Sequence, residues 1–228
     1  MSQFRIIDKI DIGHDGPIAN GPDGEEQLIH LAQGSMDGAC GPYSLMMGLM
    51  ICGLIDREDL IHLRKLDGRT NAGKLLSMLE KYQGFFRNGT EPSELVNMLE
   101  KSYPRALKAE YFKGTGVEVR NFVKKEIENN NPVILEIDFE KNSGHWVVVI
   151  GYEYQDDDNR EPLRFLLLDP NSQSPITSAW NGIVNAYGTG GRYPYIWWGK
   201  DALGNEHGKV NLFCALSLCP TKNEKKNV

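Results

Sequence analysis

Basic residues, long apolar segments and closely spaced cysteines are all scarce in this sequence. The 25 lysine and arginine residues are outnumbered by 31 aspartate and glutamate residues, which gives a net charge of -6 and a pI near 5.4. Such a surface has too little positive charge to neutralise several phosphates, so we expect no nucleic-acid partner. No segment approaches the about 18 consecutive apolar residues of a membrane-spanning helix, so we expect no membrane partner either.

The cysteines show no metal-binding or redox spacing. No pair among Cys40, Cys52, Cys214 and Cys219 forms a C-x-x-C motif. This argues against a structural zinc site or a dithiol redox site and favours free thiols in a reducing compartment, so we expect no metal and no cofactor. The first residues contain acidic side chains and no apolar core of a secretory signal. We therefore predict a cytoplasmic protein, or one exported without a cleavable signal peptide.

The composition and length predict one folded unit over residues 1–228. Hydrophobic residues make up 40% and charged residues 25%, which is ordinary for a globular protein and too apolar for a disordered one. The first 32 residues contain many turn-forming residues, and we interpret them as an irregular lead-in. We expect a helical lobe over about 33–130 and a β lobe over about 131–220.

Helical patterns dominate the first half of the chain. Residues 44–55 are apolar on every face, which indicates a helix that is buried on all sides and ends near Gly53. Further helical patterns cover residues 72–82 and 117–130. A fourth covers residues 91–103, where Thr90 is the expected cap and Pro92 suits the first turn.

Strand patterns replace the helical ones after Pro132. Residues 133–139, 145–154, 163–169 and 210–218 are rich in β-branched and apolar side chains and are separated by turn-forming clusters. Helices that precede strands in this way are typical of an α+β fold with segregated layers.

A single cysteine stands directly before the first apolar helix, in the segment QGSMDGACGP. At a helix N-terminus, the partial positive charge and the free backbone N–H groups favour the thiolate of Cys40, which is the nucleophilic form. A core cysteine is the simpler alternative for this residue taken alone. A nucleophile also needs a base, and the base must be oriented by a third group.

Three further residues complete a candidate site. Among the histidines, only His145 opens an apolar strand, in NSGHWVVVIGYE, and Asp169 ends the next strand, in LLLDPNS. If these strands are neighbours, Asp169 can accept a hydrogen bond from the imidazole and hold its tautomer, with Asn171 as the nearest substitute. Gln33 can place its amide beside Cys40 and supply an oxyanion hole together with the backbone N–H of Cys40.

The order of these motifs resembles the papain-like cysteine peptidase superfamily, and most of all its C39-like branch. The matching segments are QGSMDGACGPYSLMMGLM, SGHWVVVIGY and LLLDPNS. The resemblance implies an α+β fold in which the nucleophile helix of an N-terminal helical lobe packs against a C-terminal antiparallel sheet. It also implies that Cys40 is the nucleophile, His145 the general base and acid, Asp169 the orienting residue and Gln33 the oxyanion donor.

The predicted reaction is hydrolysis of a peptide or isopeptide bond in a peptide or protein substrate through a thioester. The same triad also supports glutamine deamidation or acyl transfer to an amine, and the sequence does not separate these reactions. A catalytically silent, protein-binding domain is a second alternative. It is favoured by the seven-residue interval between Gln33 and Cys40, because the family commonly has six. A bacterial effector or toxin is a third possibility.

The aromatic cluster at Tyr193, Tyr195, Trp197 and Trp198 is open to two interpretations. Aromatic residues at this density either line a groove or fill a core, and core packing is the favoured interpretation. The sequence identifies no substrate-binding residues and does not indicate the oligomeric state.

Overall fold

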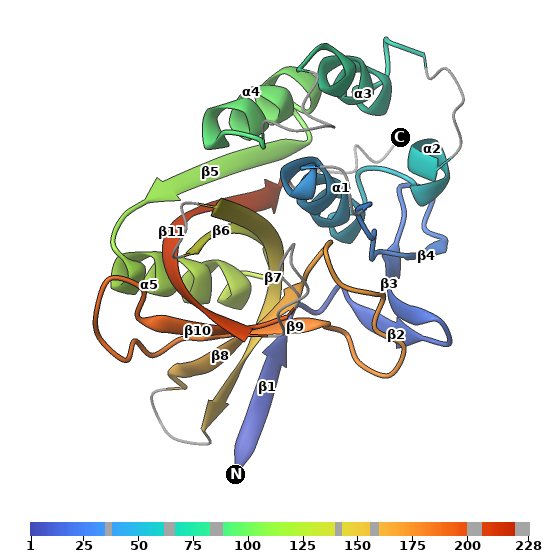
Figure 1. Ribbon diagram of the computed structural model, residues 1–228. Helices are drawn as coiled ribbons and strands as arrows, with labels where there is room; N and C mark the ends of the chain where they lie inside the picture. The colour runs from blue at the N-terminus through green and yellow to red at the C-terminus, as the bar shows by residue number, and fades with distance from the viewer. Residues whose placement is uncertain are drawn as a thin grey trace.

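Figure 1 shows the protein as a computed structural model, in which helices and strands both contribute to the fold. The structure describes residues 1–34, 38–61, 67–82, 89–139, 143–155, 160–199 and 207–221. The expected mixture of helix and sheet is confirmed.

Helices form most of the described chain between residues 40 and 128. The four expected helices are present with shifted ends, together with the short α2. They are α1 (Cys40–Ile51), α2 (Arg57–Ile61), α3 (Asn71–Tyr82), α4 (Pro92–Ser102) and α5 (Gly116–Glu128). The first of them stops just before Gly53, whose φ of +67° is one that glycine adopts without a steric cost.

The cap of α4 differs from the expected one. Glu91 is the cap instead of Thr90, and its backbone N–H donates to Oε2 of Glu94 at 2.9 Å in a capping box. This shift places Pro92 at the first helical position, where its missing N–H would have had no partner within the helix.

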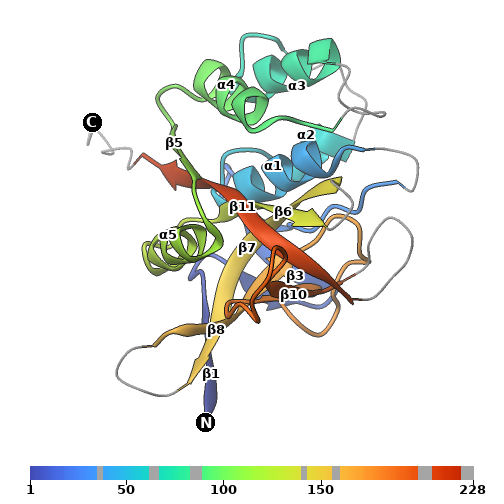
Figure 2. The same ribbon diagram turned by 60° about the vertical axis from the view of Figure 1, so that its left-hand side comes forward.

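The main sheet is antiparallel and closes on itself (Figures 1 and 2). Its strands pair in the order β7-β6-β11-β10-β9-β8, and β8 pairs back to β7. These strands are β6 (Val133–Phe139), β7 (Ser143–Gln155), β8 (Pro162–Leu168), β9 (Gly182–Asn185), β10 (Tyr195–Trp198) and β11 (His207–Pro220). Closure brings β7 and β8 together. His145 lies on β7, and Asp169 directly follows β8.

The lead-in is not irregular, so this expectation is wrong. Residues 2–28 contain β1 (Ser2–Ile6), β2 (Asp11–Gly13), β3 (Gly16–Asn20) and β4 (Glu26–Leu28). The first strand pairs with β7, and the other three form a separate small sheet. Turn-forming residues therefore mark hairpins here, and Gly16 adopts a φ of +132° at one of them.

The boundary between a helical and a β portion is also less simple than expected. Strand β5 (Leu107–Lys113) lies between α4 and α5 in the chain, but it pairs with β11 at the far end of the sequence. Helix α5 packs against β11 and not with α3 and α4 (Figure 2).

Helix α1 is buried along almost its whole length and packs against β7 and β6. A Cβ at Gly48 would meet the side chain of Leu218, so glycine allows α1 to lie close to β11. The hydroxyl of Ser44 donates to the backbone oxygen of Trp146 at 3.0 Å and fixes the helix against β7. This packing determines where the first residue of the helix meets the sheet.

The aromatic cluster mainly fills the core, as expected. Tyr193, Tyr195 and Trp197 are buried, whereas Trp198 is 45% exposed.

Candidate functional site

Cys40 is the first residue of α1 and is buried, with 8% of its surface exposed. Its neighbour Ala39 is the cap and makes no side-chain capping hydrogen bond. No capping side chain therefore accepts from the first backbone N–H groups of the helix. These groups favour a negative charge at the helix N-terminus.

His145 lies on β7 opposite Ile137 of β6. Its side chain is largely shielded, with 13% exposed. The indole ring of Trp197 lies edge-on to the imidazole, with ring centroids 6.4 Å apart. This arrangement restricts the imidazole and limits the access of water to it.

Asp169 follows β8 directly, and its side chain is fully buried. The imidazole Nε2 of His145 lies 2.7 Å from Oδ1 of Asp169, and the backbone N–H of Asn171 donates to the same oxygen at 2.8 Å. Asp169 thus contacts the ring. With Nε2 directed at the carboxylate, Nδ1 is the imidazole nitrogen left to face Cys40.

The thiol of Cys40 and the imidazole of His145 interact electrostatically, and each shifts the pKa of the other. Burial is the largest single influence and by itself raises the pKa of Cys40, whereas the hydrogen bonding and charge of His145 lower it. Hydrogen bonds from the backbone N–H groups of Trp146 and Gly41 lower the pKa further, so that it lies below the ordinary value of 9.0. All of these contacts stabilise the thiolate.

The imidazole is shifted in the complementary direction. Burial alone would lower the pKa of His145, but the charge and hydrogen bond of Asp169, supported by those of Cys40, raise it to about 10. Over the pH range between the two pKa values, the site holds a thiolate beside an imidazolium.

The pKa values of the other three cysteines are shifted in the opposite direction, upward. Burial raises the pKa of Cys52 to about 12, and it is also the largest cause of the raised pKa values of Cys214 and Cys219. Cys214 donates to Glu136 at 2.9 Å, which further favours its protonated form. Among the four thiols, only that of Cys40 has a lowered pKa.

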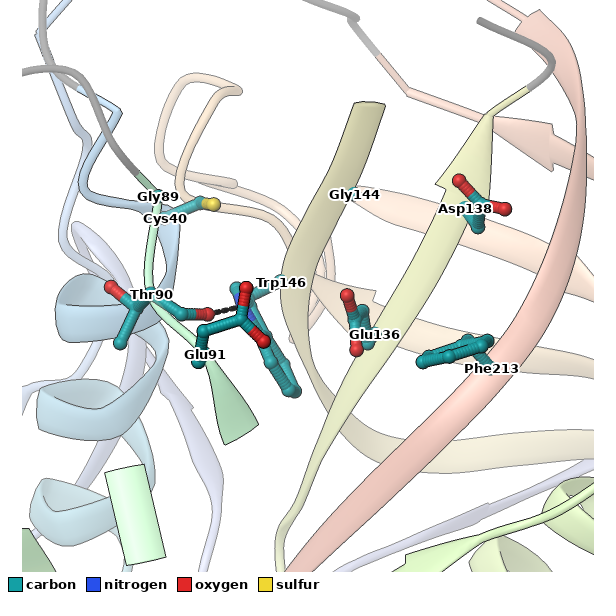
Figure 3. A pocket seen from close by; sticks show the side chains of 9 residues that line it. All are labelled: Cys40, Gly89, Thr90, Glu91, Glu136, Asp138, Gly144, Trp146 and Phe213. Atoms are coloured by element: carbon teal, nitrogen blue, oxygen red, sulfur yellow. Dashed lines mark hydrogen bonds between the residues drawn. The ribbon is translucent and has the colours of Figure 1, made fainter. Parts of the chain in front are cut away.

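A pocket of about 390 Å³ opens beside Cys40. Figure 3 shows Cys40 on one side of it, Phe213 on the other, and the carboxylates of Glu91, Glu136 and Asp138 around it. No lysine or arginine is among the described residues that line this pocket. Burial and the charges of Glu91 and Asp138 raise the pKa of Glu136, and this rise exceeds the opposing effects of the Cys214 hydrogen bond and the charge of Lys113.

Gln33 is held close to the aspartate by its main chain. Its backbone N–H donates to the oxygen of Pro170 at 2.8 Å, and its side-chain Oε1 is buried without a hydrogen-bond partner among the described residues. Part of the loop from Gln33 to Cys40 lies outside the described residues, so the seven-residue interval is not described throughout.

Sequence reasoning missed two residues that contact Asp169. Asn181 and His30 both make hydrogen-bond contacts with its main chain. His30 stands in an ordinary polar segment and Asn181 in a segment of turn-forming residues, and no local pattern marks either of them.

The described part of the chain holds no group of three or more histidine, cysteine, aspartate or glutamate residues placed to bind a metal ion. None of the helices in the described ranges is long and apolar enough to cross a membrane.

A thiol, an imidazole and a carboxylate joined by hydrogen bonds are the functional groups that cysteine hydrolases use. The sequence model of the Peptidase_C39 like family matches residues 25–193, which is more than half of the chain. The chain therefore belongs to the Peptidase_C39 like family, and the resemblance to the C39-like branch is confirmed.

No curated protein matches the chain. Among solved structures, the chain is similar to the crystal structure of UfSP from C. elegans, with a TM-score of 0.47 and 14% sequence identity. The similarity covers 96% of this chain and 34% of the UfSP chain, so the present chain spans about a third of that protein's length.

Proposed function

We propose that the protein is a cysteine peptidase that hydrolyses peptide or isopeptide bonds. In this proposal Cys40 is the nucleophile, His145 the general base and acid, and Asp169 the residue that orients the imidazole. The observation that carries the proposal is the 2.7 Å contact between the imidazole of His145 and the buried carboxylate of Asp169, beside a cysteine at the start of α1 whose pKa that imidazole lowers. The lowered pKa of Cys40 and the adjacent pocket support it.

Catalysis starts from the thiolate and imidazolium pair. Sγ of Cys40 attacks the carbonyl carbon, and the carbonyl oxygen takes up the negative charge. When the C–N bond breaks, the imidazolium of His145 gives its proton to the leaving amine, and a thioester remains. The neutral imidazole then takes a proton from water, the resulting hydroxide attacks the thioester, and the acid product leaves as the thiolate is regenerated.

The negative charge on the carbonyl oxygen needs hydrogen-bond donors. We assign this role to the backbone N–H of Cys40 and the side-chain amide of Gln33. The short backbone hydrogen bond from Gln33 to Pro170 supports the assignment, because it keeps Gln33 next to the segment that carries Asp169.

The papain-like layout belongs to the same proposal. A buried α1 whose first residue meets β7 is consistent with a nucleophile helix packed against an antiparallel sheet. In this layout α1 supplies Cys40, the main sheet supplies His145 and Asp169, and the pocket at Cys40 receives the substrate.

The decisive test is hydrolysis of a mixed peptide library, analysed by mass spectrometry. Wild type is expected to cut peptides, and Cys40→Ala is expected to leave them intact. Cys52→Ala, which changes the cysteine at the C-cap of α1, is the matched control and is expected to keep the activity. Release of ammonia without cleavage would identify deamidation, and amine incorporation would identify acyl transfer. Unchanged peptides with wild type would favour the silent binding domain.

An effector or toxin role is a separate part of the proposal. It predicts that expression of wild type in the cytoplasm slows bacterial growth and that Cys40→Ala abolishes this effect. Normal growth with wild type at an equal protein level would contradict it.

A further inference from the structure

Asn181 holds both backbone polar groups of Asp169. The N–H of Asp169 donates to Oδ1 of Asn181 at 2.7 Å, and Nδ2 of Asn181 donates to the backbone oxygen of Asp169 at 2.9 Å. The second hydrogen of Nδ2 is directed to the backbone oxygen of Gln173 at 3.1 Å. One side chain therefore fixes the peptide groups on both sides of the aspartate's Cα and ties them to the following loop.

His30 contacts the same carbonyl from the other end of the chain. Its Nε2 lies 3.0 Å from the backbone oxygen of Asp169 and 2.9 Å from Nδ2 of Asn181, and the residue is 3% exposed. The hydrogens of Nδ2 are already directed to two carbonyls, so the hydrogen-bond network assigns the remaining donor, Nε2–H, to His30. Burial is the main cause of the lowered pKa of His30, which favours a neutral ring with a single N–H.

The backbone of Asp169 needs such support because it lies beyond the end of β8. The last paired residues of that strand are Leu168, with β7, and Leu167, with β9. Within the turn that follows, the backbone N–H of Ser172 donates to the oxygen of Asp169 at 3.2 Å, a longer contact than those of Asn181 and His30. The sheet therefore does not fix the aspartate, whereas these two side chains do.

We infer that Asn181 and His30 are positioning residues that hold the main chain of Asp169 so that its Oδ1 stays within hydrogen-bond distance of His145. The inference rests on the proposed function, because it gives the aspartate a role in orienting the imidazole. A displaced carboxylate stabilises the imidazolium of His145 less, so a smaller fraction of the ring is charged. The thiolate of Cys40 is then stabilised less in turn.

The test measures the rate at which iodoacetamide labels Cys40 as a function of pH, since this rate follows the thiolate fraction. Asp169→Asn is the reference variant, because it removes the carboxylate charge directly. Asn181→Ala is expected to move the labelling profile to higher pH in the same direction. If the pKa of Cys40 rises by about one unit in the variant, its thiolate fraction falls by about tenfold at any pH below the pKa values of both proteins.

His30 offers a rescue pair that separates positioning from stability. His30→Phe keeps an aromatic ring but loses the N–H, and we expect its labelling profile to shift. His30→Gln restores an N–H donor and is expected to return the profile toward that of wild type. The unfolding temperatures of both variants are measured for comparison. If His30 had a merely structural role, the shift of the labelling profile would follow the loss of unfolding temperature and not the presence of an N–H donor.

The outcomes are distinguishable. If Asp169→Asn shifts the profile but Asn181→Ala and His30→Phe label like wild type, the positioning role is wrong and the proposed triad stands. If Asp169→Asn itself leaves the profile unchanged, the triad fails, and the positioning inference fails with it. If Asn181→Ala does not fold, the comparison of His30→Phe with His30→Gln decides the inference alone.

Discussion

The imidazole of His145 and the carboxylate of Asp169 are 24 positions apart in the sequence, yet Nε2 and Oδ1 lie 2.7 Å from each other. The pairing of β7 with β8 produces this contact, because it brings the start of one strand beside the end of the other. The carboxylate is fully buried, so water does not compete for the imidazole N–H. This leaves the second nitrogen of the ring for the thiol of Cys40.

Selective labelling of one thiol is the first prediction. At about pH 6, iodoacetamide is expected to modify Cys40 and spare the other three cysteines, because only the pKa of Cys40 is lowered. His145→Ala removes the two largest influences that lower the pKa of Cys40, so this pKa should rise and labelling should slow sharply. Peptide mapping by mass spectrometry identifies the modified residue. Equal labelling of wild type and His145→Ala would contradict the thiolate–imidazolium pair.

The pH dependence of peptide hydrolysis follows from the same two shifts. Activity is expected to rise as Cys40 loses its proton, below the ordinary thiol value of 9.0, and to fall as His145 loses its proton near 10. Between these limits the nucleophile is ionised and the acid for the leaving amine is still protonated. Initial rates of hydrolysis across this range measure the profile. A single rising limb, with no loss of activity up to and beyond 10, would show that His145 does not act as the acid.

Gln33→Ala tests the oxyanion donor. Removal of one donor typically lowers kcat by about 10²- to 10³-fold, and we expect KM to change little because the charge develops only in the transition state. Labelling of Cys40 by iodoacetamide forms no oxyanion and should stay at the wild-type rate. Wild-type kcat in Gln33→Ala would assign the buried amide a structural role instead.

The helices and central strands could be predicted because their signals are local. The all-apolar pattern of α1 and the β-rich runs of β6, β7 and β8 each report burial within a few consecutive residues. The candidate site could be predicted for the related reason that each of its residues adjoins such a segment. Cys40 opens α1, His145 lies near the start of β7, and Asp169 follows β8.

The remainder depends on contacts that the local sequence does not encode. Strand β1 has mostly exposed side chains and no clear alternation, and it forms by pairing with β7, about 150 positions away. The contact of His30 with Asp169 spans 139 positions and that with Asn181 spans 151. Contacts between single residues of this kind leave no periodicity in a sequence, so only the fold shows them.

The carboxylates of the pocket predict a charge preference. Among peptides that wild type cleaves, those with lysine near the scissile bond should have a higher kcat/KM than matched peptides with glutamate, and added salt should reduce the difference. Glu136→Gln keeps an oxygen acceptor for Cys214 but removes one charge, so the preference should fall by about fivefold, or ~1 kcal/mol. Glu100→Gln, an exposed change in α4, is the matched control. Equal rates for both peptides with wild type would contradict this prediction.

A second buried carboxylate predicts how stability depends on pH. Oε2 of Glu126 accepts hydrogen bonds from Ser217 at 2.8 Å and Asn131 at 3.0 Å, and its side chain is 3% exposed. Burial alone would raise its pKa, but these hydrogen bonds, with the charge of Lys125 and the thiol of Cys219, outweigh burial and lower it. A lowered carboxyl pKa contributes stability above the ordinary value of 4.5, and this contribution disappears as the pH falls through the lowered value.

Ser217→Ala should therefore reduce the free energy of unfolding near neutral pH by about 1–3 kcal/mol, because a buried charge loses a hydrogen bond. The loss should shrink in acid, where Glu126 becomes protonated and the charge is no longer present. Urea unfolding at neutral and acidic pH measures both effects, and Ser93→Ala, at an exposed serine of α4, is the matched control with little expected change. A loss for Ser217→Ala that is equal at both pH values would mean that packing around the serine, and not the charge of Glu126, determines its contribution.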